Sequence, residues 1–253
     1  MAIKIDMAGK VALVTGAGSG LGRATVHQLA EARAKLCLVD VDKDSLAETA
    51  ALLADTGAEL LINPADLADP DACRAAVAAS VDHFGRLDAL CNIAGIIYLA
   101  NSHEMPADLW HKTMAVNLSA PWFLSQAAIP HLLETNGAIV NCASSAAFVG
   151  EAYAAAYCAS KAGLVNMTKA MAMEYVEKPI RINAVAPGGM MTNIATNFRP
   201  PEGANIDLIK RYSGLRGLVE VDDVADMICL LASDAGSGFH GSCINLDAGI
   251  TAG

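Results

Sequence analysis

The chain has 253 residues, of which 54% are hydrophobic, and it carries a formal net charge of −10 with a pI near 4.9. This length and apolar content suit one compact domain spanning residues 1–253. A nucleic-acid or anionic-membrane partner would call for a basic stripe, which this acidic sequence lacks, so we expect small-molecule partners. There is no charged-then-apolar leader, and the long uncharged stretch 113–133 contains Asn, Ser, Gln, Pro and His. These features predict a soluble, cytoplasmic protein without a membrane span.

The cysteines and histidines show no pattern of a metal or disulfide framework. The seven cysteines are odd in number, scattered and free of Cys-x-x-Cys pairs, and the six histidines have no ligand spacing. Such a pattern is typical of reduced thiols in a core. We therefore expect no metal site.

Short aliphatic and β-branched runs alternate along the chain with longer segments of helical character. The runs predict strands at residues 11–14, 36–39, 59–63, 87–91, 138–142, 180–185 and 243–246. Helices are expected after the first strand and at residues 43–55, 69–84, 110–133, 154–176 and 224–232, with Asp69 as an N-cap and a break near Pro121. Repeated strand–helix units with strands buried on both faces indicate an α/β fold, a doubly wound parallel sheet of about seven strands with helices on both faces.

A glycine-rich turn, Thr15–Gly22, lies between the first strand and the first helix, with glycines at 16, 18, 20 and 22. Because glycine loses the most backbone entropy on ordering, four glycines here favour a tight turn with close backbone approach to a ligand. The N–H groups at the start of the following helix would then favour an anion such as phosphate. The spacing G-x-x-x-G-x-G matches neither G-x-G-x-x-G nor a Walker loop, and a turn without a ligand is the alternative.

Polar residues follow the ends of several predicted strands, where open parallel sheets bind their ligands. Asp40 ends the second strand, and its carboxylate suits the adenosine ribose hydroxyls of a dinucleotide. A phosphate on that ribose would meet like charge, and no arginine lies beside Asp40 or inside the glycine-rich turn. The sequence therefore predicts NAD rather than NADP. The alternative is that Asp40 only caps the following turn.

A second constellation is Tyr157-Cys158-Ala159-Ser160-Lys161, in which a tyrosine and a lysine lie four residues apart on one helix face. A nearby ammonium favours the phenolate, so the pair is suited to acid–base chemistry. Ser144 follows the fifth strand at the same sheet edge, where its hydroxyl would donate to a substrate oxygen. The alternative is a stacked tyrosine beside a solvated lysine.

Residues 190–217 break the strand–helix rhythm and are long for a connection, so we expect a substrate loop or lid. A surface insertion without function is the alternative. Apolar residues in and near this segment suggest an apolar substrate pocket, although they also suit a core or a subunit interface. These residues are Phe148, Val149, Met190, Met191, Ile194 and Phe198.

Together these motifs resemble the short-chain dehydrogenase/reductase family in its NAD-preferring form, over nearly the whole chain. They are Thr15-Gly16-x-x-x-Gly20-x-Gly22, Asn92-Ile93-Ala94-Gly95, Asn117, Ser144, Tyr157-x-x-x-Lys161, and Pro187-Gly188 with Thr192. One departure is Ile93, which interrupts the contiguous Asn-Ala-Gly that is frequent in the family. Tyr153 precedes Tyr157 by one helical turn but lacks a lysine four residues on, and the family spacing selects Ser144 over Ser145.

The resemblance implies a homotetrameric enzyme that interconverts a secondary alcohol and a ketone by hydride transfer. Tyr157 would be the general acid/base, Lys161 would lower its pKa and hold the nicotinamide ribose, Ser144 would orient the substrate oxygen, and Asn117 would support a proton relay. The cofactor-binding residues would be Gly16, Ser19, Gly20, Leu21, Gly22, Asp40, Asp66, Leu67, Asn92, Ala94, Gly95, Tyr157, Lys161, Pro187, Gly188 and Thr192.

The expected substrate is a small alcohol or ketone. Its contacts would be Ser144, Ala146, Glu151, Tyr157, Gly189 and Met190. Glu151 would contact a polar substrate group or cap the next helix. Two other functions fit the fold: an NADPH-type 3-ketoacyl-carrier-protein reductase, which usually carries basic residues near the glycine-rich turn, and a non-catalytic NAD-binding sensor.

Overall fold

The chain folds around one parallel sheet in the computed structural model, which describes residues 5–192, 199–214 and 216–252. Ile194 and Phe198 of the expected apolar pocket lie outside these ranges. The seven strands are β1 (Val11–Thr15), β2 (Lys35–Asp40), β3 (Leu60–Pro64), β4 (Ala89–Asn92), β5 (Ala138–Cys142), β6 (Arg181–Pro187) and β7 (Cys243–Leu246). All strands pair in parallel in the order β3-β2-β1-β4-β5-β6-β7.

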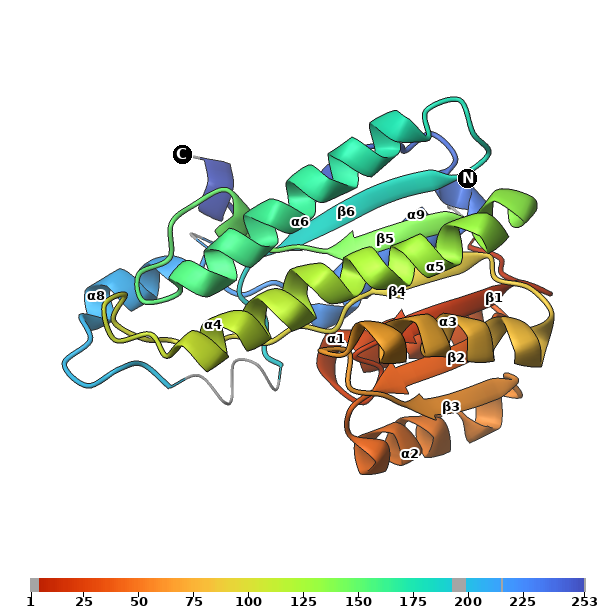
Figure 1. Cartoon of the computed structure of the whole chain (residues 1–253), viewed down its shortest axis with the longest axis horizontal. Helices are drawn as coiled ribbons and strands as arrows, with labels where there is room; N and C mark the ends of the chain where they lie inside the picture. Colours follow the sequence, from red (N-terminus) through yellow and green to blue (C-terminus); the bar gives the residue numbers. More distant parts are fainter. Residues whose placement is uncertain (1–4, 193–198, 215, 253) are drawn as a thin grey trace.

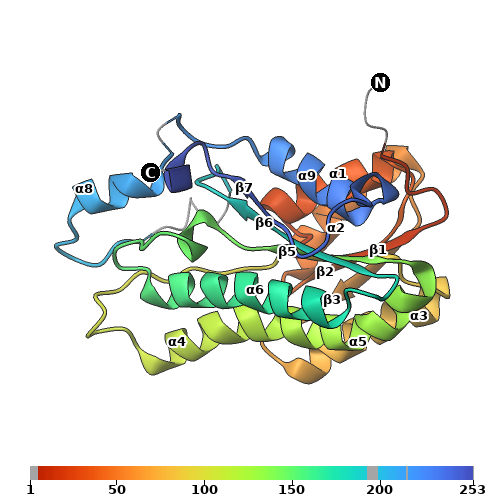
Figure 2. The same cartoon turned by 90° about the horizontal axis from the view of Figure 1, so that it is seen from above.

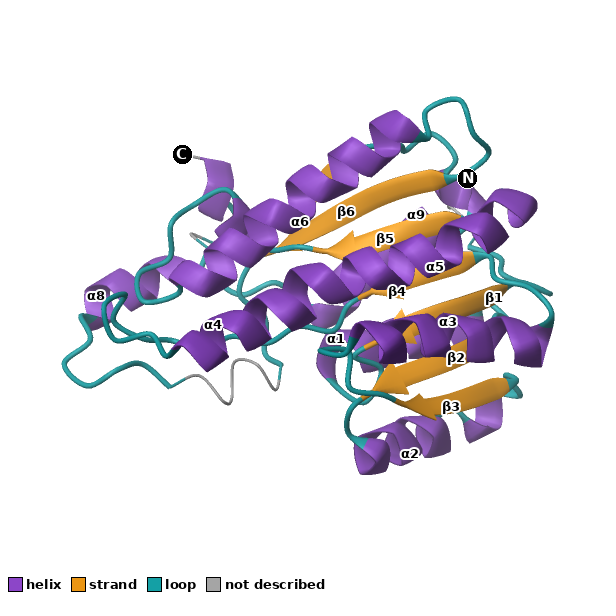
Figure 3. Cartoon of the chain, viewed as in Figure 1, coloured by secondary structure: helices purple, strands orange, loops and turns teal. Residues whose placement is uncertain are grey.

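Strand order reverses between β1 and β4, and their carboxyl ends therefore diverge at a crevice. The strand arrowheads visible in Figure 3, such as those of β1, β2 and β5, point toward the end of the molecule where α8 lies, and the other strands are parallel to them. The polar residues that follow the strands consequently gather at this one end.

Helices cover both faces of the sheet, as Figures 1 and 2 show. The helices α1 and α9 pack against each other on one face, with α2 beside them, while α3, α5 and α6 cover the other. The helices are α1 (Gly20–Glu31), α2 (Lys43–Leu52), α3 (Pro70–Phe84), α4 (Ala107–Met114), α5 (Ala120–Thr135), α6 (Ala155–Glu174), α8 (Ile206–Ile209) and α9 (Val221–Ala232). The predicted α/β doubly wound fold is confirmed.

The inner strands β2, β1, β4, β5 and β6 are buried on both faces because successive side chains point to opposite helical layers, whereas the edge strands β3 and β7 are only partly buried. In β1, Val14 packs in one core cluster with Leu29 of α1, whereas Leu13 packs in the other with Leu124 of α5. Each of these side chains is at most 1% exposed. The two core clusters therefore pack on opposite faces of the sheet and hold the strands and the loops that follow them in place.

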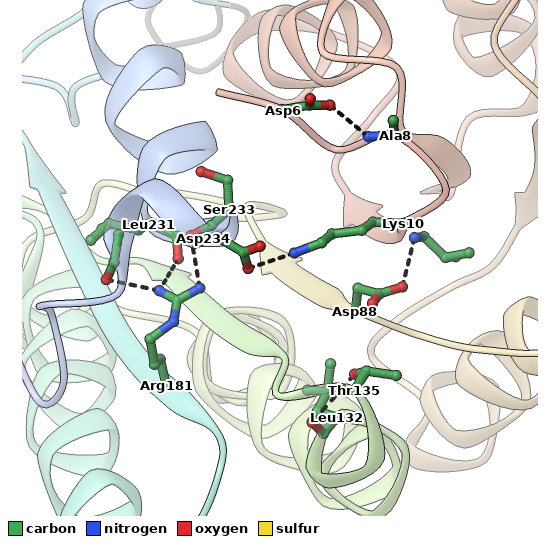
Figure 4. Close-up of polar contacts among 12 residues, drawn as sticks. Asp6, Ala8, Lys10, Asp88, Leu132, Thr135, Arg181, Leu231, Ser233 and Asp234 are labelled. Atoms are coloured by element: carbon green, nitrogen blue, oxygen red, sulfur yellow. Dashed lines mark hydrogen bonds and ion pairs between the residues drawn. The ribbon is translucent and has the colours of Figure 1, made fainter. Parts of the chain in front are cut away.

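Polar contacts secure the amino ends of the strands, away from the crevice (Figure 4). The guanidinium of Arg181, at the start of β6, donates to the carbonyls of Leu231 at 2.7 Å and Ser233 at 2.9 Å. The carboxylate of Asp88 accepts the Val11 N–H at 2.9 Å and so joins β4 to β1. These contacts satisfy buried backbone groups at helix and strand ends.

The expected helix 110–133 is interrupted near Pro121, as predicted. A π-helical turn, Ala115–Ser119, separates α4 from α5. Pro121 falls in the first turn of α5, where its missing N–H leaves no helical hydrogen bond unmade. The extra residue of the π turn therefore accounts for the interruption.

Part of the segment 190–217 has regular structure. Asn205 caps α8 through its side chain, a 3₁₀ turn spans Lys210–Tyr212, and Gly214 pairs with Gly217. The described part of this segment therefore contains a short helix, a 3₁₀ turn and a β-bridge. None of the described helices is both long and apolar enough to cross a bilayer, and all seven cysteines are free thiols.

Candidate active site

A cavity of about 580 Å³ opens at the carboxyl ends of the strands, over the crevice between β1 and β4. It brings together the glycine-rich turn and the Tyr157–Lys161 helix, which lie about half the chain apart. The predicted cofactor residues that line it are Gly16, Ser19, Gly20, Leu21, Gly22, Asp40, Asp66, Leu67, Ala94, Gly95, Tyr157, Lys161, Pro187, Gly188 and Thr192. Of the predicted set, only Asn92 lies outside the lining.

The glycine-rich turn is packed too closely for a side chain at its last glycine. A Cβ on Gly22 would lie 1.9 Å from the Gly16 carbonyl oxygen. Gly16 itself has φ +70°, a left-handed conformation that glycine adopts without cost. The first turn of α1 holds no acidic residue, and the side chain of its N-cap, Ser19, makes no capping bond. The helix start therefore presents donors and a positive dipole end to the cavity, as a phosphate group requires.

The Asp40 carboxylate is held in place from two sides. It accepts the Gly18 N–H at 3.0 Å and the Asp42 N–H at 3.1 Å, so it caps the following turn and also lines the cavity. The two sequence interpretations of Asp40 are thus compatible. Arg23, the residue that follows the glycine-rich turn, donates to the Gly18 carbonyl from outside the cavity lining.

Other contacts engage the Arg23 side chain as well. Its guanidinium bonds to Thr49 at 2.9 Å and to Glu48 at 3.1 Å. The charge is therefore partly neutralised by Glu48, and Arg23 supports the turn from behind.

The loop after β4 is fixed to β1 by a threonine. The Thr15 hydroxyl oxygen accepts the Ile93 N–H at 2.9 Å and the Ala94 N–H at 3.1 Å. Thr15 is 1% exposed, so it satisfies two N–H groups that water does not reach. Ile93, the departure from the family pattern, lines the cavity without disturbing this anchor.

Asn92 does not point into the cavity, contrary to its predicted cofactor contact. Its amide donates to the Asn141 side chain at 2.8 Å, and Asn141 in turn donates to Thr168 at 2.9 Å. Asn92 is 2% exposed. The side chain therefore joins β4 to β5 and α6 inside the core, a role that follows from neighbouring strands and not from its place in a motif.

The first turns of α6 present the predicted catalytic pair. Tyr157 and Lys161 both line the cavity, and the Lys161 Nζ lies 5.7 Å from the centre of the Tyr157 ring. Lys161 is 3% exposed, and its Nζ donates to the Cys142 carbonyl at 2.7 Å. Ser144 lines the same cavity from the end of β5. One end of the cavity thus holds a phenol, an ammonium and a hydroxyl.

Asn117 lies in the π-helical turn and contacts the loop after β4. Its side chain accepts the Ile96 N–H at 2.9 Å and donates to the Ile96 carbonyl at 2.8 Å and to Ser160 at 3.1 Å. A Cβ on Gly95 would lie 3.5 Å from the Lys161 Nζ and 3.6 Å from the Asn117 Oδ1. The backbone of Gly95 is thus adjacent to both groups.

Burial controls the pKa values of the catalytic pair. It raises the pKa of Tyr157, which the Ser144 hydroxyl partly offsets, and it lowers the pKa of Lys161. The net shift of the Tyr157 pKa is therefore opposite to the predicted lowering by Lys161. The reason is that the desolvation of the phenolate is larger in free energy than its attraction to the Lys161 ammonium, which lies 5.7 Å from the ring centre.

The predicted substrate residues divide into two groups. Ser144, Tyr157 and Met190 line the cavity, whereas Ala146, Glu151 and Gly189 lie outside its lining. The Ala146 N–H donates to the Ser144 hydroxyl oxygen at 3.2 Å, so Ala146 orients Ser144 through its backbone. A Cβ on Gly189 would meet Leu218 at 3.1 Å, which indicates close packing beneath the substrate loop.

Glu151 does not cap α6 through its side chain, because the N-cap of that helix is Ala154 without a side-chain cap bond. Burial raises the pKa of Glu151 to about 7. Its charge contributes to the raised pKa values of Tyr157 and Tyr212.

Several lining residues escaped the sequence reasoning. Among them are Tyr98 and Ile96 from the loop after β4, and Lys112 and Val116 from α4 and the π turn. Lys112 and Val116 lie four residues apart and therefore share one helix face, which is the signal that would have placed them together. No cluster of three or more metal-ligating side chains occurs within residues 5–192, 199–214 and 216–252.

Comparisons with known proteins agree with this architecture. A family model described as enoyl-(acyl carrier protein) reductase matches residues 16–251. The 2,5-dichloro-2,5-cyclohexadiene-1,4-diol dehydrogenase of Sphingobium indicum is 36% identical over 98% of both chains. D-threitol dehydrogenase of Mycolicibacterium smegmatis is 36% identical over 96% of this chain and 93% of its own.

Among solved structures, carveol dehydrogenase from Mycobacterium avium in complex with NAD superposes with a TM-score of 0.88 at 27% identity, covering 97% of this chain and 99% of its own. The fold and the matched relatives place the chain among Rossmann-type oxidoreductases. It belongs to the short-chain dehydrogenase/reductase family.

Proposed function

We propose that the chain is an NAD(H)-dependent oxidoreductase that interconverts a secondary alcohol and a ketone. The observation that carries the proposal is one cavity lined by both the glycine-rich turn with Asp40 and the trio Ser144, Tyr157 and Lys161. The first group suits a dinucleotide and the second suits proton transfer at a carbinol. Relatives named as dehydrogenases of threitol and of a cyclic diol support the reaction class.

The residues present fit NAD. The close approach of Gly16 and Gly22 leaves backbone room for a pyrophosphate at the start of α1. Asp40, held by Gly18 and Asp42, accepts from the ribose hydroxyls and repels a phosphate on that ribose. Arg23 is engaged by Glu48 and lies outside the lining, so it does not offer a phosphate site. The NAD in the carveol dehydrogenase complex is consistent with this assignment.

When bound, the dinucleotide supplies the hydride acceptor for alcohol oxidation. The Tyr157 phenolate takes the hydroxyl proton, while the Ser144 hydroxyl donates to the same substrate oxygen and stabilises its developing charge. In ketone reduction the Tyr157 phenol returns the proton. Lys161, a buried cation beside the ring, favours the phenolate, and the positive charge of the oxidised nicotinamide assists it against the cost of burial.

Asn117 holds the loop at Ile96 next to Lys161, and a water bound there would pass the proton toward solvent. Met190 and the chain around residues 190–217 would contact the substrate, with Ala146 and Gly189 acting through their backbones. We also infer a homotetramer. Support comes from the half-exposed Trp122 beside Met167, in a groove of about 440 Å³ between α5 and α6.

The test compares NAD with NADP in initial-rate assays of NAD(P)H absorbance on small diols and cyclic or aromatic secondary alcohols. We expect turnover with NAD and a much lower kcat/KM with NADP. Equal efficiency with both cofactors would contradict the role of Asp40. NAD binding without turnover of any alcohol or ketone would instead support a non-catalytic sensor, and selective reduction of ketoacyl thioesters with NADPH would support the reductase alternative.

A further inference from the structure

Tyr153 has an unusual backbone conformation close to the active site. It lies four residues before Tyr157, just ahead of α6, and has φ +68°. The left-handed region is unfavourable for a bulky aromatic residue, and such strain persists only where surrounding contacts impose it. A glycine or asparagine would adopt this turn at lower cost.

Two hydrogen bonds hold Tyr153 in this conformation. Its backbone carbonyl accepts the Ala100 N–H at 2.9 Å. Its hydroxyl oxygen accepts the Asn205 N–H at 2.8 Å. One residue therefore joins the loop after β4 to the segment that leads into α8.

Both joined segments border the candidate active site. The loop after β4 lines the cavity through Ile96 and Tyr98, a few residues before Ala100. On the other side, Asn205 caps α8 by accepting the Asp207 N–H at 2.9 Å. Figures 1 and 2 show α8 at the end of the molecule where α6 begins.

The chain after α8 continues across this end to Tyr212. The carbonyl oxygen of Tyr212 lies 3.5 Å from the position of a Cβ on Gly189, which directly follows Pro187 and Gly188 of the cavity lining. Burial raises the pKa of Tyr212, and the charges of Glu151, Cys158 and Tyr153 add to this shift. The Tyr153 hydroxyl thus anchors the start of a segment that reaches Gly189, next to the cavity lining.

We propose that Tyr153 is a positioning residue that sets substrate affinity by anchoring residues 205–212 next to the cavity lining. It acts through the Asn205 N–H and does not take part in proton transfer. The inference rests on the proposed function, because it assigns the adjoining part of the cavity to the alcohol or ketone. It leaves the NAD half of the cavity, around Gly16 and Asp40, unaffected.

The first test is Tyr153→Phe, which keeps the ring and removes the hydroxyl. Loss of one hydrogen bond predicts a rise of about fivefold in KM for the alcohol, equivalent to about 1 kcal/mol. We expect kcat to change less than about twofold and the Kd for NAD to stay constant. Hydrogen–deuterium exchange of the amides in residues 203–212 should become faster. The matched control is Tyr175→Phe, which removes a hydroxyl at the opposite end of α6. It should change neither the KM for the alcohol nor the amide exchange of residues 203–212.

A second variant separates anchoring from stability. Tyr153→Gly relieves the left-handed strain, so its Tm should equal or exceed that of the wild type, yet its KM should still rise. A Tyr153→Phe protein with unchanged KM and unchanged exchange would overturn the proposal, as would parallel losses of Tm and kcat in both variants. If the wild type oxidises no alcohol, the proposed function fails, and the exchange of residues 203–212 still decides whether Tyr153 anchors the segment.

Discussion

The substitution Gly22→Ala should disrupt the glycine-rich turn more than any other change of one methyl group there. The new Cβ would lie 1.9 Å from the Gly16 carbonyl oxygen and 2.5 Å from its carbon, so the backbone at Gly16 has to move by more than about 1 Å. Overpacking against a side chain costs about 1–3 kcal/mol, and a clash with backbone belongs at or above the upper end. A loss of about 3 kcal/mol corresponds to a fall in Tm of about 6–12 °C for a chain of this size.

The same displacement moves the N–H groups at the start of α1, so NAD affinity should fall at least tenfold, or about 1.4 kcal/mol. Thermal unfolding followed by circular dichroism measures the Tm, and calorimetric titration with NAD measures the affinity. Gly238→Ala is the control, because a Cβ there meets nothing within 4 Å. A Gly22→Ala protein with wild-type Tm and NAD affinity would refute the close approach on which the turn's function depends.

Two further changes test the electrostatics and the anchoring of the site. Burial raises the pKa of Glu151 from 4.5 to about 7, so the wild type loses at most about 3 kcal/mol of unfolding free energy as the pH rises between these values. Glu151→Gln should therefore raise the stability above pH 7 and change it little below pH 4. Urea unfolding at several pH values measures this, and parallel pH profiles for the two proteins would contradict it. Thr15→Val should cost about 2 kcal/mol in urea unfolding, because the Ile93 and Ala94 N–H groups lose their acceptor. Thr25→Val, which removes only a hydroxyl donating to the Leu21 carbonyl, is its control and should cost less than about 1 kcal/mol; equal losses would show that the Thr15 acceptor is unimportant.

Much of the fold follows from local sequence patterns. Residues 138–142 and 243–246 are strands with the predicted bounds. The first is buried on both faces, as expected for a central parallel strand, whereas the second is an edge strand and only partly buried. Asp69 is the predicted N-cap of α3 and accepts the Asp71 N–H. The sequence predicted a break near Pro121 but not its π-helical geometry, in which Asn117 meets the Ile96 N–H of a distant loop.

The site was predictable as far as topology determines it. Parallel strands deliver their carboxyl ends to one crevice, and motif residues at those ends therefore meet in one cavity. The directions of side chains could not be predicted in the same way, because the Asn92 side chain points into the core and donates to Asn141. The direction of the Tyr157 pKa shift also depends on burial, which arises from packing between distant segments.

The central claim is that Tyr157 transfers the proton while NAD occupies the cavity. The most direct measurement is steady-state turnover of Tyr157→Phe with NAD and an alcohol that the wild type oxidises, alongside calorimetric NAD binding by the same protein. Because the phenyl ring preserves the packing but cannot exchange a proton, turnover should fall about 10²- to 10⁴-fold while the Kd for NAD changes little. Turnover close to the wild-type rate would contradict the proposed mechanism.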